Sequence, residues 1–477
     1  MPVLGVTSSP DASVGPKPRP RTGVVLATLL TCQLMIMVDV TVMNVALPGI
    51  GSDLDVGATG LTWVTHGYTL AFGGLLLLGG RAGDLWGRRR MFLTGVALFT
   101  AASAVGGLAP SAAWLVGARV VQGVGAAVAG PNALALLTTV FTEPRARMRA
   151  LALYSGMAGA GFAVGLLVGG VLTQGLGWRA VLFINVPLGG LALLAAVRCL
   201  PAVPRRPGRL DLPGALTATA GVTALVYGFN RAATHGWGDA AACLALGAGA
   251  VSAVAFVAVE RGAAQPLLPL SLFADRDRAA AYANVFVGYM ASIPMFFFLS
   301  LYVQEVRGLG ALATGFAFLP TAALMFALIQ WVPRLLRRFG PGPITLTGSV
   351  SMVAALVLLT RLTTGTPYVP LVLAAALLMG CGTGLALMPL SVVIMSRVPQ
   401  DVAGVAGGAL QTIQQTGAAL GLSVLTTVFG AASRGAAGPP RQVLVTGVTA
   451  AFTAAAVMAA LTIPGTLAFR RRRRDEP

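Results

Sequence analysis

The sequence Leu34-Met-Ile-Met-Val-Asp39-Val-Thr-Val-Met-Asn-Val-Ala-Leu-Pro48 decides the fold, because it places one carboxylate inside a long apolar run. About 20 consecutive apolar residues are enough for a helix to cross a bilayer. Asp39 lies deep within such a run, where a charge costs at least about 2.5–3.5 kcal/mol on insertion scales. Two interpretations stay open: a structural carboxylate held by a buried partner, and a proton-binding residue. We favour the second, because a protonatable group at mid-membrane is what proton coupling requires.

The composition requires a membrane as the solvent. Of 477 residues, 56% are hydrophobic and only 10% are charged. A soluble domain of this size cannot bury so much apolar surface. Apolar windows of spanning length predict fourteen helices between residues 24 and 468, joined by short loops. The predicted fold class is therefore all-α, a polytopic membrane protein.

The charge and the rare residue types exclude several functional classes. The net charge of +18 does not indicate nucleic-acid binding, because the basic residues lie in short loops between apolar runs and not on one folded face. The single lysine, Lys17, lies in the N-terminal tail, so the chain has no P-loop. Four scattered cysteines and two histidines form neither a disulfide framework nor a metal site. The sequence contains no set of nucleophile, base and metal ligands that would indicate an enzyme. We therefore predict no enzymatic activity, and we expect no cofactor.

The basic residues also predict the orientation. With the N-terminus inside, 26 of the 33 basic residues fall in cytoplasmic segments and six in outer loops. This bias predicts a multi-pass protein of the inner (plasma) membrane with both termini in the cytoplasm. Residues 1–23 are expected to form a cytoplasmic tail, and the basic residues 469–477 to anchor the last helix at the inner face.

Four motifs, in order along the chain, carry a resemblance to a known family. They are the pattern Asp-x-Thr-x-x-Asn-x-Ala-x-Pro within residues 38–48, the loop Gly79-Gly-Arg-Ala-Gly-Asp-Leu-Trp-Gly-Arg-Arg-Arg90, the segment 115–127, and the segment 177–187. With them, the chain resembles the major facilitator superfamily, in particular its fourteen-helix drug:proton antiporter branch. The resemblance implies the major facilitator fold and transport of a small molecule.

The loop motif predicts a gate at the cytoplasmic surface. Its glycines allow a tight turn and close helix approach, and its acidic residue can form a charge-assisted clamp with the neighbouring arginines. The resemblance implies that this clamp holds the inner gate and breaks when the cavity opens inward. The alternative is that the arginines only set the topology. The predicted gate residues are Gly80, Asp84, Gly87, Arg88 and Arg89.

Arg119 is the second charge predicted inside the membrane. At 1.5 Å per residue it lies roughly 10 Å below the outer end of its helix, and Asp39 lies roughly 12 Å below the outer end of the first. The matching depths allow a pair between them, direct or through water. The resemblance implies that Arg119 acts in proton relay or in organising the helices. Gln122 lies one turn along the same face and can extend the network.

A glycine stripe follows in the fifth predicted helix. Gly161, Gly165 and Gly169, with Gly170 beside them, predict close packing on a neighbouring helix. The antiporter motif of the family has a proline after the middle glycine, where this sequence has Leu166. The packing stripe is therefore kept, but the motif by itself does not establish exchange.

An internal repeat predicts two related halves. The segment 332–340 resembles a degenerate copy of the loop 79–90 that lacks its aspartate. We therefore expect six-helix bundles over 24–198 and 279–468, with an inserted helix pair in 199–278. Halves related by an axis along the membrane normal place the substrate site near the midplane between them. The candidate cavity residues are Asn44, Gln122, Asn284, Tyr289, Gln330, Gln411 and Gln415. The glutamines of the thirteenth helix could equally bond to neighbouring helices.

Together these features predict proton-driven efflux of a small amphipathic antibiotic, drug or dye, with proton antiport through Asp39. With one membrane carboxylate, a neutral, zwitterionic or singly charged substrate is favoured over a dication. A proton-coupled importer or symporter is the alternative, because the same fold supports it. The expected partners are the bilayer, protons and the substrate, and we expect the protein to act as a monomer.

Overall fold

The computed structural model describes residues 22–201, 211–263, 266–268, 270–395 and 403–471, and these residues contain helices and no strand. The first helices are α1 (Thr22–Leu54), α2 (Ala58–Trp86), α3 (Arg88–Gly107), α4 (Ala112–Val140), α5 (Pro144–Leu176), α6 (Arg179–Phe183) and α7 (Asn185–Cys199). Next come α8 (Leu212–His235) and α9 (Ala240–Gly262). The last are the short η1 (Leu270–Phe273), α10 (Arg276–Leu301), η2 (Tyr302–Val306), α11 (Ala311–Phe339), α12 (Pro341–Leu359), η3 (Tyr368–Val372), α13 (Leu373–Met395), α14 (Ala403–Gly435), α15 (Pro440–Ala460) and α16 (Thr462–Arg471).

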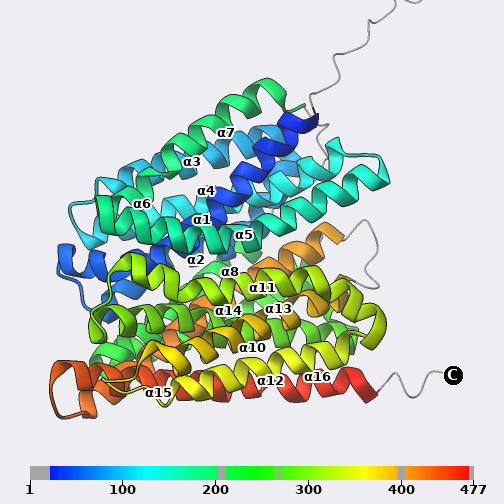
Figure 1. Ribbon diagram of the computed structural model, residues 1–477. Coiled ribbons are helices and arrows are strands. Elements are labelled where there is room, and N and C mark those ends of the chain that lie inside the picture. Colours follow the sequence, from blue (N-terminus) through cyan, green and yellow to red (C-terminus); the bar gives the residue numbers. More distant parts are fainter. Residues whose placement is uncertain (1–21, 202–210, 264–265, 269, 396–402, 472–477) are drawn as a thin grey trace, which may run out of the picture.

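The long helices run side by side in two groups, which Figure 1 shows one above the other. We call α1–α7 the N-terminal set and α10–α16 the C-terminal set. The end of the molecule that carries Arg88, Arg89 and Arg90 at the start of α3 is called the basic end, and the opposite end the far end. Helices α8 and α9 pack on each other, and α8 also contacts α2 and α14.

Most of these helices are long and apolar enough to cross a membrane. The described residues hold twelve such spans, some of which join two consecutive helices, as Arg179–Cys199 joins α6 and α7. The bent pair Ala311–Met325 and Gln330–Phe339 within α11 makes a thirteenth if it is one span. Helix α5 meets it only in part, over Val164–Leu176. The all-α membrane fold is thus confirmed, and the number fourteen stays a prediction.

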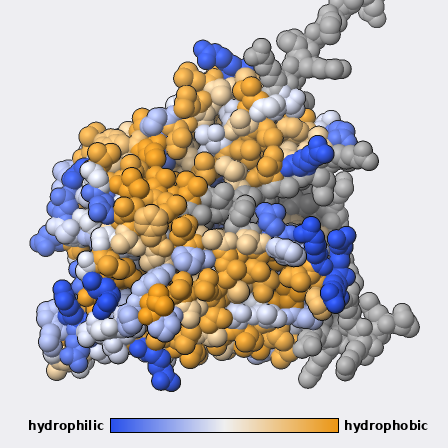
Figure 2. Space-filling view, in the orientation of Figure 1, coloured by the Kyte–Doolittle hydropathy of each residue, from blue (hydrophilic) through white to orange (hydrophobic). Residues whose placement is uncertain are grey.

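The surface agrees with immersion in lipid. On the face shown in Figure 2, hydrophobic side chains cover the middle of the molecule, and hydrophilic ones gather toward its two ends. Large apolar side chains such as Leu244 and Val254 on α9 are 74% and 71% exposed. Such exposure is unfavourable in water and is expected where acyl chains surround the protein.

The two sets repeat the same close helix contacts. Gly95 on α3 faces α4 so closely that an added Cβ would lie 2.8 Å from Gly125 O. Gly348 on α12 faces α13 in the same way, with Gly382 O at 2.9 Å. Because both pairs can be aligned, the residues around them can be compared position by position. The boundaries predicted near residues 198 and 279 stay predictions, and most of the two predicted tails lies outside the described residues.

Candidate functional site

An ion pair between α1 and α4 is the charged centre of the N-terminal set. Arg119 Nη1 donates to Asp39 Oδ2 at 2.6 Å, and each residue is only 1% exposed. The two charges that the sequence places at matching depths are thus in direct contact. Charge-assisted bonds of this kind are about twice as strong as neutral ones.

Neutral polar side chains from three helices complete the cluster around this pair. Gln122 Nε2 donates to Asp39 Oδ1 at 2.7 Å, and its Oε1 accepts from Arg119 at 2.7 Å. Asn185, the first residue of α7, donates to the same Oδ1 at 2.9 Å. Ser103 on α3 accepts from Gln122 at 2.7 Å. Asp39 therefore receives three donors, which suits an ionised carboxylate.

Arg119 has further partners that do not depend on Asp39. Its Nε donates to Val64 O at 3.3 Å, and its guanidinium carbon lies 4.4 Å from the centre of the Tyr68 ring. Both partners belong to α2. A buried charge that loses its counterion is normally destabilising by about 3–5 kcal/mol. These contacts, with Gln122, would soften that cost if Asp39 were protonated.

Glycines bring α4 close enough for these contacts. An added Cβ at Gly123 would lie 2.5 Å from Tyr68 O on α2, and one at Gly125 would lie 2.6 Å from Phe99 N on α3. The small residues of the 115–127 motif thus fix the distance of α4 from both neighbours. That spacing sets the position of the Arg119 side chain.

The glycine stripe of α5 supports the opposite side of α1. An added Cβ at Gly161 would lie 2.7 Å from Met37 Cβ, and one at Gly169 would lie 3.0 Å from Val42 Cα. Gly165 faces Thr41. The stripe therefore packs on α1 directly beside Asp39, and Leu166 is buried at the place of the family proline.

Gly170 does not share this role, because it contacts the C-terminal set. An added Cβ there would lie 2.8 Å from Leu312 Cα at the start of α11. Leu166 O comes within 2.5 Å of a Cβ added at Gly315, and Ser300 Oγ donates to Asn44 O at 3.1 Å. All these contacts between the two sets lie toward the far end.

The predicted gate residues lie together at the basic end. Arg88 donates through Nη2 and Nε to Asp84 Oδ1, at 2.9 and 3.1 Å, across the turn at Gly87, whose φ is +101°. The third nitrogen, Nη1, donates to Thr139 Oγ1 on α4 at 3.1 Å. Arg89 does not contact Asp84; it donates to Val197 O on α7 at 2.7 Å. These partners belong to the N-terminal set, so the bonds tie its own helices together.

Gly80 belongs to the same region. A Cβ added there would lie 3.4 Å from Pro131 Cβ on α4, so the glycine permits close packing of α2 on α4.

The predicted cavity residues are dispersed. Gln122 belongs to the Asp39 cluster, and the Asn44 side chain donates to Val40 O of its own helix at 3.3 Å. Gln415 packs against Gly73 on α2, whose added Cβ would lie 2.7 Å from Gln415 Cβ. The four others are half-buried Tyr289 and Gln411, exposed Gln330, and buried Asn284.

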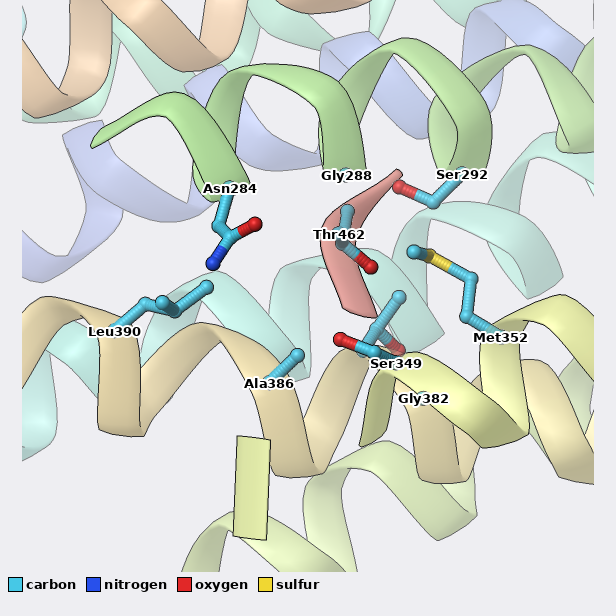
Figure 3. A pocket seen from close by; sticks show the side chains of 10 residues that line it. Asn284, Gly288, Ser292, Ser349, Met352, Gly382, Ala386, Leu390 and Thr462 are labelled. Carbon is cyan, nitrogen blue, oxygen red and sulfur yellow. The ribbon is translucent and has the colours of Figure 1, made fainter. Parts of the chain in front are cut away.

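A small pocket lies inside the C-terminal set and not between the two sets (Figure 3). Its volume is about 20 Å³. Asn284, Gly288 and Ser292 line it from α10, and Thr462 from the start of α16. The Asn284 amide nitrogen has no hydrogen-bond partner among the described atoms.

The C-terminal set has apolar side chains where the N-terminal set has its ion pair. Gly165 on α5 faces Val38 O on α1, and Gly421 on α14 faces Met290 O on α10 in the same way. The residues that follow, Asp39 and Ala291, therefore occupy equivalent positions. Gly125 on α4 is equivalent to Gly382 on α13. Counted back from these glycines by the same number of residues, Arg119 is therefore equivalent to Ala376, and Gln122 to Met379. All three C-terminal counterparts, Ala291, Ala376 and Met379, are fully buried.

Comparison with known proteins identifies the family. Residues 29–422 match the family model described as Major Facilitator Superfamily. The chain belongs to this superfamily. It is therefore a membrane transporter and not an enzyme.

Two relatives of this major facilitator protein cover nearly its whole length. The puromycin resistance protein of Streptomyces alboniger is 43% identical over 425 residues, which are 87% of this chain and 83% of that protein. The cephamycin export protein CmcT of Amycolatopsis lactamdurans is 41% identical over 419 residues, 87% of this chain and 86% of that protein.

Solved structures support the fold of the major facilitator protein. A peptide transporter in complex with sulfate has a TM-score of 0.66 at 15% identity, with 96% of each chain covered. A nucleoside transporter has a TM-score of 0.64 at 13% identity, with 93% of this chain and 99% of that chain covered. At such low identity the likeness concerns the fold alone.

Sequence reasoning missed two members of the cluster. Ser103 and Asn185 are neutral polar residues in apolar helices, and no spacing marks them as members of a cluster. The one available signal for Asn185 was its place two residues before Pro187 in the fourth motif.

Proposed function

We propose that the protein exports a small amphipathic compound, such as an antibiotic, drug or dye, in exchange for protons. The names of its two relatives, one a resistance protein and the other an export protein, support efflux. The observation that carries the proton step is the buried cluster around Asp39 and Arg119. It is a protonatable group with its counterion in the membrane-spanning part of a transporter.

The proposed orientation places the basic end in the cytoplasm and the far end outside, in a bacterial inner membrane. The positive-inside rule supports it, because the basic end carries Arg88, Arg89 and Arg90. The contacts of Gly170 with Leu312 and of Ser300 with Asn44 would then close the outer side. The conformation is accordingly one in which the outside has no access between these helices.

In the proposed cycle, the two sets rock about the site between them. When the outer side opens, a proton reaches Asp39 and neutralises it, and the Asp39–Arg119 attraction weakens. Arg119 keeps its contacts with Gln122, Val64 O and the Tyr68 ring, so the step does not leave its buried positive charge without partners. When the inner side opens, Asp39 loses the proton to the cytoplasm and re-forms the pair. An inward gradient supplies about 2.3 kcal/mol per charge per 100 mV.

The gate role of Asp84 belongs to the same proposal. In the closed-outside conformation its partner Arg88 holds α2, α3 and α4 together. We propose that Asp84 and the arginines beside it engage the C-terminal set when the inner side closes. Gly80 and Gly87 provide the close approach that this movement needs.

The substrate class follows from the number of membrane charges. The counterparts of Asp39 and Arg119 in the C-terminal set are Ala291 and Ala376, so that set offers no counterion at the equivalent level. A dication would have one carboxylate to bind, and that carboxylate is already paired. We therefore propose a neutral, zwitterionic or singly charged amphipathic substrate, carried by a single chain.

Export from energised membrane vesicles tests the proposal. A panel of lipophilic dyes and antibiotics is offered to inside-out vesicles that contain the wild-type protein or Asp39→Asn. We expect uptake into the vesicles that collapses with a protonophore and is at least about tenfold slower in Asp39→Asn, since a substitution at an essential coupling group acts on every cycle. Thr426→Val, which changes a buried polar residue of the C-terminal set that bonds within its own helix, is the control and should transport at the wild-type rate.

Two outcomes would contradict the proposal. Normal gradient-driven transport by Asp39→Asn would place coupling elsewhere. Gradient-driven movement of the compounds toward the cytoplasmic side would favour a proton-coupled importer.

A further inference from the structure

A buried polar network joins α2, α8 and α14. Ser423 Oγ on α14 lies 3.1 Å from His66 Nε2 on α2 and 3.4 Å from Asn230 Nδ2 on α8. Thr62 Oγ1 on α2 donates to Asn230 Oδ1 at 2.9 Å. The four residues are at most 3% exposed, and none of them belongs to the Asp39 cluster. One helix of the N-terminal set, one of the C-terminal set and α8 thus share a single chain of hydrogen bonds.

Further bonds fasten α8 to α14 on the same side. Thr427 Oγ1 donates to Phe229 O at 2.7 Å, and Arg434 Nη1 donates to Ala233 O. Buried Val226 on α8 packs with Leu70 on α2 and Ala419 on α14 in one apolar cluster. Helix α8 therefore lies along the junction at which α2 and α14 contact each other, and it bonds to both.

The network lies in the half of the membrane nearer the far end. Thr62 is about 6 Å, and Asn230 about 8 Å, from the far ends of α2 and α8, at 1.5 Å per residue. On the opposite side of the molecule, α5 and α11 meet at the same end through glycine packing at Gly170 and Gly315. The far end is thus closed by close packing on one side and by hydrogen bonds on the other.

We infer that His66, Asn230 and Ser423 form a latch that holds the outer side closed, with α8 as the strap across this junction. Opening the outer side separates α2 from α14, so the His66–Ser423 contact must break. The two bonds through Asn230 cannot both survive that movement, because α8 has to stay with one partner helix. The latch rests on the proposed alternating access and orientation, and it is independent of proton coupling.

The rate of outer opening can be measured by chemical labelling. In a background with the four native cysteines replaced by alanine, Ser300→Cys places a reporter in the closed outer contact, where Ser300 is 1% exposed. A membrane-impermeant maleimide is added to right-side-out vesicles without substrate. Each lost hydrogen bond shifts an equilibrium about two- to tenfold. Because Ser423→Ala removes both bonds of this hydroxyl to α2 and α8, it should raise the labelling rate by at least that factor.

Two variants make the result specific. Thr62→Val removes one bond of the latch with little change in shape, and it should raise the rate less than Ser423→Ala. Thr426→Val is the control, because this equally buried hydroxyl of α14 bonds only Leu422 O of its own helix, and its rate should equal the wild-type rate.

Unchanged labelling in folded Ser423→Ala and Thr62→Val would overturn the latch. So would an equal increase in Thr426→Val. If Ser423→Ala does not fold, Thr62→Val alone decides. Gradient-driven export is recorded separately, on vesicles that hold the wild-type protein. Its absence there would overturn the proposed function, while the labelling comparison still judges the latch.

Discussion

The N-terminal and C-terminal sets can be compared position by position, because they share their closest helix contacts. Gly95 meets Gly125 in one set as Gly348 meets Gly382 in the other. The chemistry beside these contacts differs: an ion pair with three neutral partners in the N-terminal set, and buried alanine and methionine in the C-terminal set. Backbone packing therefore fixes the scaffold twice, and the charged residues are added to one copy only.

The pocket of the C-terminal set is likewise explained by side chains that differ between the two sets at aligned positions. When Val38 is aligned with Met290, Ile36 falls at the position of Gly288. When Gly95 is aligned with Gly348, Phe99 falls at the position of Met352. In the N-terminal set Ile36 and Phe99 are buried and belong to one packed cluster. In the C-terminal set a glycine stands in place of the isoleucine, and the space beside it is the pocket.

The largest effect is expected from giving the C-terminal set the charge that it lacks. Ala291→Asp would bury a carboxylate opposite Ala376, with no arginine to pair with it. We expect a loss of at least about 4–5 kcal/mol in the free energy of unfolding, or no folded protein, because an unpaired buried charge is among the most destabilising changes. Ala291→Asn, of equal size and uncharged, should be milder when both are unfolded in mixed micelles. If both variants lost the same free energy of unfolding, the added volume at residue 291, and not the added charge, would be the cause of the destabilisation.

Removing the cation from the N-terminal set should cost less. In Arg119→Ala, Asp39 would keep its bonds from Gln122 and Asn185, so we expect a loss of about 3 kcal/mol. The double variant Asp39→Ala with Arg119→Ala should be more stable than Arg119→Ala alone, since no charge is left unpaired. A double variant that is the less stable of the two would mean that the pair acts mainly through packing.

The glycine contacts should respond alike in both sets. Gly165→Ala would place a methyl group against Thr41, and Gly421→Ala would place one against Met290. Each should lower the free energy of unfolding by about 1–3 kcal/mol, because well-packed contacts tolerate little extra volume. Gly175→Ala is the control in α5, where nothing lies within 4 Å of the added carbon. A large loss at Gly421 with none at Gly165 would break the structural equivalence of the two sets.

The sequence predicted the parts of this comparison that depend on strong physical costs. A charge inside a membrane is expensive, so Asp39 and Arg119 stood out, and the loop motif located Asp84 and Arg88 beside each other. Neutral residues carry no such cost. Asn185 was therefore missed, and the polarity of Gln330 did not reveal that it lies on an exposed surface.

Helix interruptions were also beyond sequence reasoning. The break at Ile184 between α6 and α7 and the bend within α11 leave the apolar pattern unchanged. Hydropathy averaged over about 20 residues cannot detect a change of direction within one span. The break at Ile184 nevertheless places Asn185 at the start of α7, where its side chain reaches Asp39.

The smallest effect on stability is expected at Asp84. Each set has a loop with a glycine of positive φ, Gly87 in the N-terminal set and Gly340 in the C-terminal set. The residue three positions earlier is Asp84 in the first loop and Arg337 in the second. The Asp84–Arg88 pair is 19–23% exposed at its side chains, and such pairs contribute at most about 1 kcal/mol. Asp84→Asn should therefore unfold within about 1 kcal/mol of the wild type in mixed micelles, yet export more slowly in energised vesicles. That combination would mean that the carboxylate acts in the conformation closed at the basic end. A stability loss well above 1 kcal/mol would instead make it a structural brace of α2, α3 and α4.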